Sequence, residues 1–173
     1  MDPGVRPDPQ PTGVQIRPAT ASDRAALGRY GAALMRQHHA ADPRRFLLTP
    51  RPEEGYGRFL VSELEDPDCI VRVAERLGEV VGYVFASIEP TSWRDLRGPG
   101  GFIHDVYVDE RARRTGTGEA LLRAAIAWIH SRGMTQVVLA TKSGNESARR
   151  LFAKIGFRET MREMTLDGDP SGA

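Results

Sequence analysis

The chain has 173 residues, 40% of them hydrophobic, and a formal net charge of +1, so it is long enough for one domain with a sizeable core and less basic than a general nucleic-acid binder. Its single cysteine, Cys69, excludes an intrachain disulfide and a multi-cysteine metal site, and no apolar run approaches the ~20 residues of a membrane span. We therefore expect a cytoplasmic chain whose partners include no metal, no membrane and no nucleic acid.

Composition divides the chain into three parts. The first residues are rich in proline and poor in apolar side chains, so they cannot bury enough surface to offset the entropy lost on ordering. The last residues are polar and include glycine and proline. The sequence therefore predicts a disordered proline-rich tail at 1–13, one domain at 14–167 and a flexible tail at 168–173.

Hydrophobic periodicity predicts a succession of helices and strands along the domain. Apolar residues three or four positions apart behind a capping residue indicate helices, and alternating or Val- and Ile-rich runs indicate strands. The strand–turn–helix–strand succession after residue 100 implies a right-handed parallel unit. The expected strands are 14–17, 69–75, 80–88, 101–108, 135–141 and 157–166, with a bulge between Met161 and Met164, and the expected helices are 21–39, 52–64, 119–132 and 145–155.

The chain is organised around residues 101–132, which pass from a strand through a basic, glycine-rich turn into a helix. A helix start carries unpaired N–H groups and partial positive charge, so it can hold a phosphate. Gly116 and Gly118 let the backbone approach such an anion closely. An ordinary strand-to-helix turn has the same spacing. No Lys-Ser/Thr follows the glycines, so this is not the phosphate loop of nucleotide hydrolases.

Two segments resemble the signatures of the GNAT superfamily of N-acetyltransferases. Arg113-Arg114-Thr115-Gly116-Thr117-Gly118 is similar to the acyl-CoA signature Gln/Arg-x-x-Gly-x-Gly/Ala, and the segment from Asn145 to Phe157 resembles the second signature. The resemblance implies an α/β fold of the α+β type, the acyl-CoA N-acyltransferase (GNAT) fold. Its mixed sheet, flanked by helices, would split centrally between strands 101–108 and 135–141, and acetyl-CoA would lie in the split as the co-substrate.

The resemblance also implies which residues bind acetyl-CoA. Backbone groups at 106–108 would pair with the pantetheine arm, N–H groups at 114–119 would hold the pyrophosphate, and Asn145 would contact the pantetheine. Some of the basic residues would contact the ribose phosphate of CoA, although any single one of them is more commonly just a solvated surface residue of a helix. These residues are Arg111, Arg114, Lys142, Arg149 and Arg150. The full expected binding set is Val106, Tyr107, Val108, Arg113, Arg114, Thr115, Gly116, Thr117, Gly118, Glu119, Asn145 and Phe152.

His104 is the candidate general base. It lies near where many small-amine members of the family carry a glutamate, and it resembles the position of a histidine in arylalkylamine N-acetyltransferases. An imidazole with an unperturbed pKa of ~6.5 suits proton removal at neutral pH. A histidine that only bonds across the sheet is the alternative, and Asp105 is the fallback base. By the family's pattern, the oxyanion donor would be the Val106 N–H. Alternation places Phe102, His104, Val106 and Val108 on one face of the strand and Ile103, Asp105 and Tyr107 on the other.

Phe152 departs from the family's pattern. Members often carry a tyrosine there, whose hydroxyl protonates the departing thiolate, and phenylalanine cannot donate. Either the thiolate leaves without an acid, or another group serves, such as Ser147, Tyr107 or a water. Phe152 is equally a core residue of its helix.

The expected activity is acetyl-CoA-dependent N-acetyl transfer to a primary amine of a small molecule, by direct attack in a ternary complex, in a chain that forms a homodimer. The alternatives are a protein N-terminal or lysine acetyltransferase and a catalytically impaired acyl-CoA-binding sensor. The acceptor wall is expected from 34–59 and 89–100, with Trp93 packed onto the domain. Glu53, Glu54, Asp95 and Asp105 are acids that could attract a cation. His38, His39 and Asp42 do not predict a metal, because adjacent helical side chains point about 100° apart.

Overall fold

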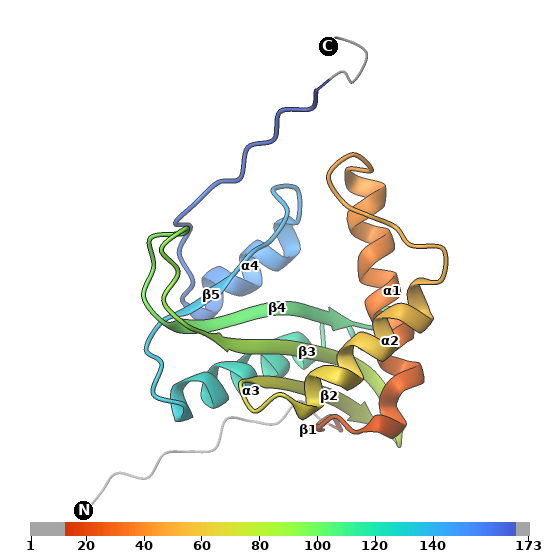
Figure 1. Cartoon of the computed structure of the whole chain (residues 1–173). Helices are drawn as coiled ribbons and strands as arrows, with labels where there is room; N and C mark the ends of the chain where they lie inside the picture. The colour runs from red at the N-terminus through yellow and green to blue at the C-terminus, as the bar shows by residue number, and fades with distance from the viewer. Residues whose placement is uncertain (1–12, 169–173) are drawn as a thin grey trace, which may run out of the picture.

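The computed structural model describes residues 13–168, which form a five-stranded sheet with helices on both faces (Figure 1). The tails expected at 1–13 and 168–173 lie outside the described residues except for Gly13 and Gly168. Within residues 13–168, no helix is both long and apolar enough to cross a membrane.

The sheet is mixed, with strand order β1-β2-β3-β4-β5. The first four strands are antiparallel neighbours, and the last pairs parallel with β4. The expected fold class, the hairpin and the parallel unit are therefore confirmed. The strands are β1 (Gln15–Pro18), β2 (Cys69–Arg76), β3 (Glu79–Glu89), β4 (Gly100–Val108) and β5 (Val137–Leu139), the last being shorter than the strand expected at 135–141.

Helices cover both faces of the sheet because the side chains of β3 alternate between two apolar clusters. Tyr83 and Phe85 pack with residues of α1 and α2, whereas Val84 and Ala86 pack with residues of α3. The apolar side of α4 adjoins the α3 cluster. The helices are α1 (Arg24–Ala41), α2 (Pro52–Ser62), α3 (Thr117–Ser131) and α4 (Glu146–Ile155), with 3-10 turns η1 (Ala21–Asp23), η2 (Glu63–Glu65) and η3 (Glu110–Ala112).

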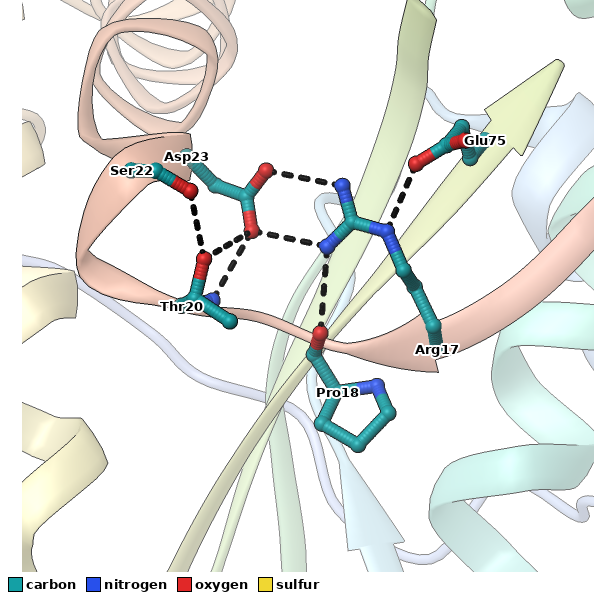
Figure 2. Close-up of polar contacts among 6 residues, drawn as sticks. All are labelled: Arg17, Pro18, Thr20, Ser22, Asp23 and Glu75. Carbon is teal, nitrogen blue, oxygen red and sulfur yellow. Dashed lines mark hydrogen bonds and ion pairs between the residues drawn. The ribbon is translucent and has the colours of Figure 1, made fainter. Parts of the chain in front are cut away.

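Arg17 ties the entry of α1 to the sheet. Its guanidinium donates to the two carboxylate oxygens of Asp23 at 2.8 and 2.9 Å, and its Nε donates to Glu75 of β2 at 2.6 Å (Figure 2). Asp23 is only 7% exposed and also accepts from the Thr20 N–H, which closes a capping box at η1. The hydrogen bonds from Arg17 hold the pKa of Asp23 below its usual value. This corner is therefore held by a charged network rather than by apolar packing.

The strand expected at 157–166 is wrong. Residues 157–168 contain no helix or strand, so the expected bulge does not exist, and Met161, Met164 and Leu166 are 80%, 89% and 96% exposed. Charged side chains hold the segment instead, because Glu163 pairs with Arg45 and Asp167 pairs with Arg44 at 3.2 Å. The segment runs away from the sheet toward the loop after α1 (Figure 1), so within residues 13–168 β5 stays the last strand of the sheet.

Candidate active site

β4 pairs with the whole of β5, but only over residues 101–103 of its own length. The paired positions are Gly101 with Val137, Phe102 with Val138 and Ile103 with Leu139, so β4 has no β5 partner from residue 104 onward. The split expected in the sheet is therefore present. Because adjacent strands share hydrogen bonds only at that contact, the second half of β4 presents a free backbone edge to the split.

The backbone of Val106 and Val108 faces this split. The Asp109 N–H donates to the Val81 carbonyl of β3 at 2.8 Å. The Tyr107 carbonyl also points toward β3, because a Cβ added at Gly82 would lie 2.6 Å from its oxygen. Since backbone groups alternate in direction along a strand, those of Val106 and Val108 point the other way. The Val108 carbonyl indeed accepts a 3.1 Å bond from the Arg113 side chain on that side.

A β-bulge at His104 changes which side chains of β4 share a face. Asp105 pairs with Phe85 and Ile103 pairs with Ala86, so His104 is the extra residue. Ile103 and Val106 both join the cluster beneath α3. His104 lies beside the Phe85 ring, and Asp105 bonds to residues of the α1–α2 side. The expected strict alternation, which placed Asp105 on the face opposite His104, is therefore wrong.

A cavity of about 420 Å³ opens where β4 and β5 diverge. One end is formed by α4 and the residues before it, and the other by α1, the loop that follows it and α2. Residues 103–106 of β4 lie between the two ends. The lining residues are Leu34, Met35, His38, Arg45, Phe46, Leu47, Tyr56, Ile103, His104, Asp105, Val106, Leu139, Ala140, Thr141, Asn145, Ala148 and Phe152. The expected acceptor wall at 34–59 and the expected acetyl-CoA side therefore meet in one cavity.

The loop at 89–100 is not part of this cavity, which corrects the expectation that it forms an acceptor wall. Ser92 and Arg97 exchange backbone hydrogen bonds of 3.0 and 3.1 Å, so the loop folds on itself near the start of β4, away from the split (Figure 1). Trp93 is 87% exposed, so the expectation that it packs onto the domain is also wrong.

Asp105 is held by two tyrosines. The hydroxyls of Tyr56 and Tyr83 donate to its Oδ2 at 2.7 and 3.0 Å. Tyr56 fits against α1 only because Gly31 has no side chain, since a Cβ there would lie 2.0 Å from the Tyr56 ring. The other carboxylate oxygen, Oδ1, accepts no hydrogen bond from the described residues. It is not fully buried either, so it is open to the cavity that Asp105 lines.

Burial raises the pKa of Asp105, and the hydrogen bonds from the two tyrosines partly oppose that rise. Burial, with Asp105 nearby, also raises the pKa of Tyr56, so its hydroxyl stays protonated and donates. From the sequence, Asp105 was expected as the fallback base, but its two tyrosine partners were not expected. The only signal was an aspartate within an apolar strand, and its partners come from segments distant in the sequence.

His104 lines the cavity and also bonds across the sheet. Its Nε2 lies 2.7 Å from the Ser87 hydroxyl and 3.6 Å from Glu89, and its side chain is 37% exposed. The two alternatives expected for this residue, a general base and a histidine that bonds across the sheet, are thus compatible. Ser87 can orient the ring through one nitrogen while the other nitrogen remains free to accept a proton.

The turn before α3 has the geometry of an anion site. Arg114 and Gly116 adopt left-handed conformations, with φ of 61° and 85°. The helix begins at Thr117, and its first backbone bond runs from the Ala120 N–H to the Gly116 carbonyl at 3.0 Å. The N–H groups of residues 117–119 therefore have no helical partner and carry the positive end of the helix dipole. Thr115 steadies the turn by donating to the Ala112 carbonyl at 2.7 Å.

Glu119, in the first turn of α3, joins this site to the last turn of α4. It accepts bonds from Lys154 at 2.6 Å and Arg123 at 2.9 Å, which together hold the pKa of Glu119 below its usual value. Its negative charge at the helix start is thereby offset. Neither cation was expected from the sequence. Arg123 lies four residues after Glu119 in the same helix, whereas Lys154 comes near only because α4 packs beside α3.

The basic residues expected near the ribose phosphate mostly have protein partners. Arg111 pairs with Asp109, Arg149 with Glu159 and Arg150 with Glu146, and Lys142 donates to the Gln37 carbonyl. Within residues 13–168, Arg114 forms no ion pair. It stands at the turn itself, with an exposed side chain. Arg114 is therefore the member of the set best placed for a phosphate.

Residues of α4 complete the cavity. The Asn145 side chain accepts from the Ala148 N–H at 3.2 Å, so it caps the helix as expected, and both residues line the cavity. Phe152 is 7% exposed and packs against Phe157, yet it also lines the cavity. Tyr107 stacks on Tyr30 instead. Neither Tyr107 nor Ser147 is among the lining residues, so the two side chains suggested as an alternative acid are absent from the cavity lining.

His38 and His39 bond to different backbone carbonyls. His38 Nδ1 lies 2.9 Å from the Leu34 carbonyl, and His39 Nδ1 lies 2.7 Å from that of Phe46. Only His38 lines the cavity.

Comparisons with known proteins agree with this geometry. The family model described as the acetyltransferase (GNAT) family matches residues 32–157. An uncharacterised N-acetyltransferase of Bacillus subtilis, YhfO, is 30% identical over 148 residues, which cover 84% of this chain and 91% of that protein. The mycothiol acetyltransferase of Thermobispora bispora is 38% identical over 85 residues, and the match covers 49% of this chain but only 28% of that relative's length.

A solved structure shares the fold. The aminoglycoside N-acetyltransferase AAC(6')-Iy, determined in complex with CoA, superposes with a TM-score of 0.72 at 18% identity. The match covers 92% of this chain and 97% of that one.

Proposed function

The chain belongs to the acetyltransferase (GNAT) family, and from that premise we propose that it transfers an acetyl group from acetyl-CoA to a primary amine of a small molecule, by direct attack in a ternary complex. The observation that carries the proposal is the cavity at the split, which runs past the free edge of β4 from α4 to the α1–α2 side. Two substrates can therefore meet at Val106 from opposite ends. The aminoglycoside and mycothiol acetyltransferases among the similar proteins support a small-molecule acceptor.

In this proposal, acetyl-CoA occupies the α4 end of the cavity. The N–H groups at the start of α3 hold the pyrophosphate, together with Arg114. The Val106 and Val108 backbone groups pair with the pantetheine arm as an added strand would. Asn145, Ala148 and Phe152 line the opposite side of this end.

The chemical step needs a neutral amine. His104 accepts a proton from the acceptor ammonium, with its ring oriented by Ser87. The amine nitrogen then forms a bond to the thioester carbon, and the displaced electron pair moves onto the carbonyl oxygen, which the Val106 N–H stabilises. When the intermediate collapses, the C–S bond breaks and its electrons leave with the CoA sulfur as a thiolate. The second proton of the nitrogen is released to solvent.

The thiolate leaves without a protein acid in this scheme. Phe152 stands where many family members carry tyrosine, and its ring has no proton to donate. Water reaching the cavity protonates the thiolate after departure, which is a tolerable route because a thiolate is a comparatively stable leaving group.

The test is acetyl transfer by the purified chain, followed as CoA thiol release and as acetylated product by mass spectrometry. We expect turnover with small primary amines and a loss of ~100-fold in kcat for His104→Gln. Ser87→Ala, which removes only the orienting hydroxyl, should lose less. CoA binding without turnover of any amine would instead favour a catalytically impaired acyl-CoA-binding sensor. The observation behind that second candidate is Phe152, which lacks the hydroxyl that a tyrosine would supply. Acetylation of protein N-termini or lysines alone would contradict the small-molecule acceptor.

The proposal extends to the setting of the reaction, a homodimer in the cytoplasm acting without a metal, membrane or nucleic acid. The single cysteine and the near-neutral charge support the setting. The exposed apolar side chains of Met161, Met164 and Leu166 support a dimer, which light scattering of the purified chain would detect.

A further inference from the structure

The acceptor end of the cavity combines one open carboxylate oxygen with an apolar wall. Oδ1 of Asp105 is open to the cavity, and Tyr56 and Tyr83 fix the carboxylate through Oδ2. The wall around it is formed by four apolar side chains of α1 and the loop after it: Leu34, Met35, Phe46 and Leu47. Such a site offers one place for a positive charge and several for hydrocarbon.

The other acids that could attract a cation are engaged elsewhere. Glu53 pairs with Arg36, Glu54 pairs with Arg58 at 2.6 Å, and Asp95 bonds to Ser92 at 2.7 Å. None of the three lines the cavity. Among residues 13–168, Asp105 is therefore the only carboxylate in the lining.

The remaining charged side chain in the lining is a cation. Arg45 packs over the Phe46 ring at 5.0 Å and pairs with Glu163. His38 and His104 add no negative charge in either protonation state. An acceptor with several ammonium groups would place the second and third against hydrocarbon or beside Arg45, whose neighbouring carboxylate, Glu163, is already paired with it.

We propose that the acceptor is a primary amine with a single positive charge and an apolar aliphatic or aromatic body, and that its ammonium group binds Oδ1 of Asp105 before it reacts at His104. The inference rests on the proposed acetyl transfer and narrows its substrate class. It separates this chain from enzymes that act on polycations such as aminoglycosides and polyamines.

The first experiment compares kcat/KM for four amines at saturating acetyl-CoA and constant ionic strength: 2-phenylethylamine, hexylamine, spermidine and kanamycin. We expect kcat/KM for the two monocationic amines to be ~10-fold or more above that for the two polycations. A factor of this size corresponds to the loss of about one charged contact. A preference for spermidine or kanamycin would overturn this inference and leave the acetyl transfer standing. Turnover on none of the four would overturn both.

Variants then test the two halves of the site. Asp105→Asn keeps an oxygen for the tyrosine hydroxyls but removes the charge, so KM for 2-phenylethylamine should rise ~10-fold or more while the acetyl-CoA Kd is unchanged. Leu47 is 67% exposed, so Leu47→Glu adds a carboxylate to the wall at little risk to folding. It should lower KM for spermidine and raise that for hexylamine.

The matched control is Leu48→Glu, which makes the same change at the next residue, outside the cavity lining. It should alter neither KM. Equal effects of the two glutamates would show that net charge, rather than the wall, governs acceptor choice, and would overturn the inference. An unchanged amine KM in Asp105→Asn would do the same.

Discussion

The hydroxyl of Tyr56 in α2 donates a 2.7 Å hydrogen bond to Oδ2 of Asp105 in β4, across 49 residues of sequence. The bond joins the helical layer to the strand that lies at the middle of the cavity. It depends on Gly31, because a Cβ there would lie 2.0 Å from the Tyr56 ring. A change in the packing of α1 against α2 would therefore reach the proposed acceptor site directly.

Tyr56→Phe should shift the pH dependence of the reaction. The Tyr56 hydroxyl lowers the pKa of Asp105, so its removal raises that pKa further. A protonated Asp105 cannot bind an ammonium ion, so the acidic limb of kcat/KM for 2-phenylethylamine should move to higher pH. The control is Tyr30→Phe, which removes a hydroxyl bonded to Val80 and Asp109 outside the cavity. An acidic limb unchanged in Tyr56→Phe would exclude this coupling.

Gly116→Ala should weaken acetyl-CoA binding. Gly116 has φ of 85°, and an alanine there costs about 1 kcal/mol and disturbs the N–H groups at the start of α3. Gly133→Ala is the matched control, because its φ of 80° lies just beyond the other end of the same helix with open space around it. We expect a similar loss of stability in both variants but a CoA Kd raised ~10-fold only in Gly116→Ala, measured by calorimetry. Equal Kd values would contradict the phosphate role of this turn.

Phe152→Tyr should raise kcat. The new hydroxyl would enter the α4 end of the cavity, where it could protonate the thiolate, and general acid catalysis at an unassisted step can give ~10-fold or more. Phe157→Tyr is the control, because its ring packs against Phe152 but does not line the cavity. If kcat is the same in Phe152→Tyr, departure of the thiolate does not limit the rate.

Arg17→Met should destabilise the chain in a pH-dependent way. It leaves the Asp23 carboxylate, only 7% exposed, without its cation, which should cost about 2–3 kcal/mol in urea unfolding at pH 7. Asp23 has a lowered pKa when folded, so its contribution is present above its unfolded pKa and is lost as the pH falls through the folded value. The difference from the unaltered chain should therefore shrink in acid.

Arg51→Met provides the comparison for that measurement. Arg51 is 82% exposed and pairs with Glu54 on the surface, so its loss should change the free energy of unfolding by less than about 0.5 kcal/mol. A similar effect at both positions would show that Arg17 acts as an ordinary surface charge.

Features that depend on neighbouring residues could be predicted from the amino-acid sequence. Glycine positions and apolar spacing predicted the turn before α3, the Asn145 cap of α4 and the succession of helices and strands. These features follow from local backbone preferences and helix periodicity, which a short segment carries within itself.

Tertiary structure alone decided which side chains meet. The bulge at His104 depends on the register with β3, and it turned Asp105 toward Tyr56 and Tyr83, against the expected alternation. The segment at 157–168 shows the converse. Its apolar residues suggested a strand, but the segment leaves the sheet without pairing, and its charged side chains Glu163 and Asp167 pair with Arg45 and Arg44 in the loop after α1. Pairing and burial depend on residues far apart in the chain, so no single segment of sequence encodes them.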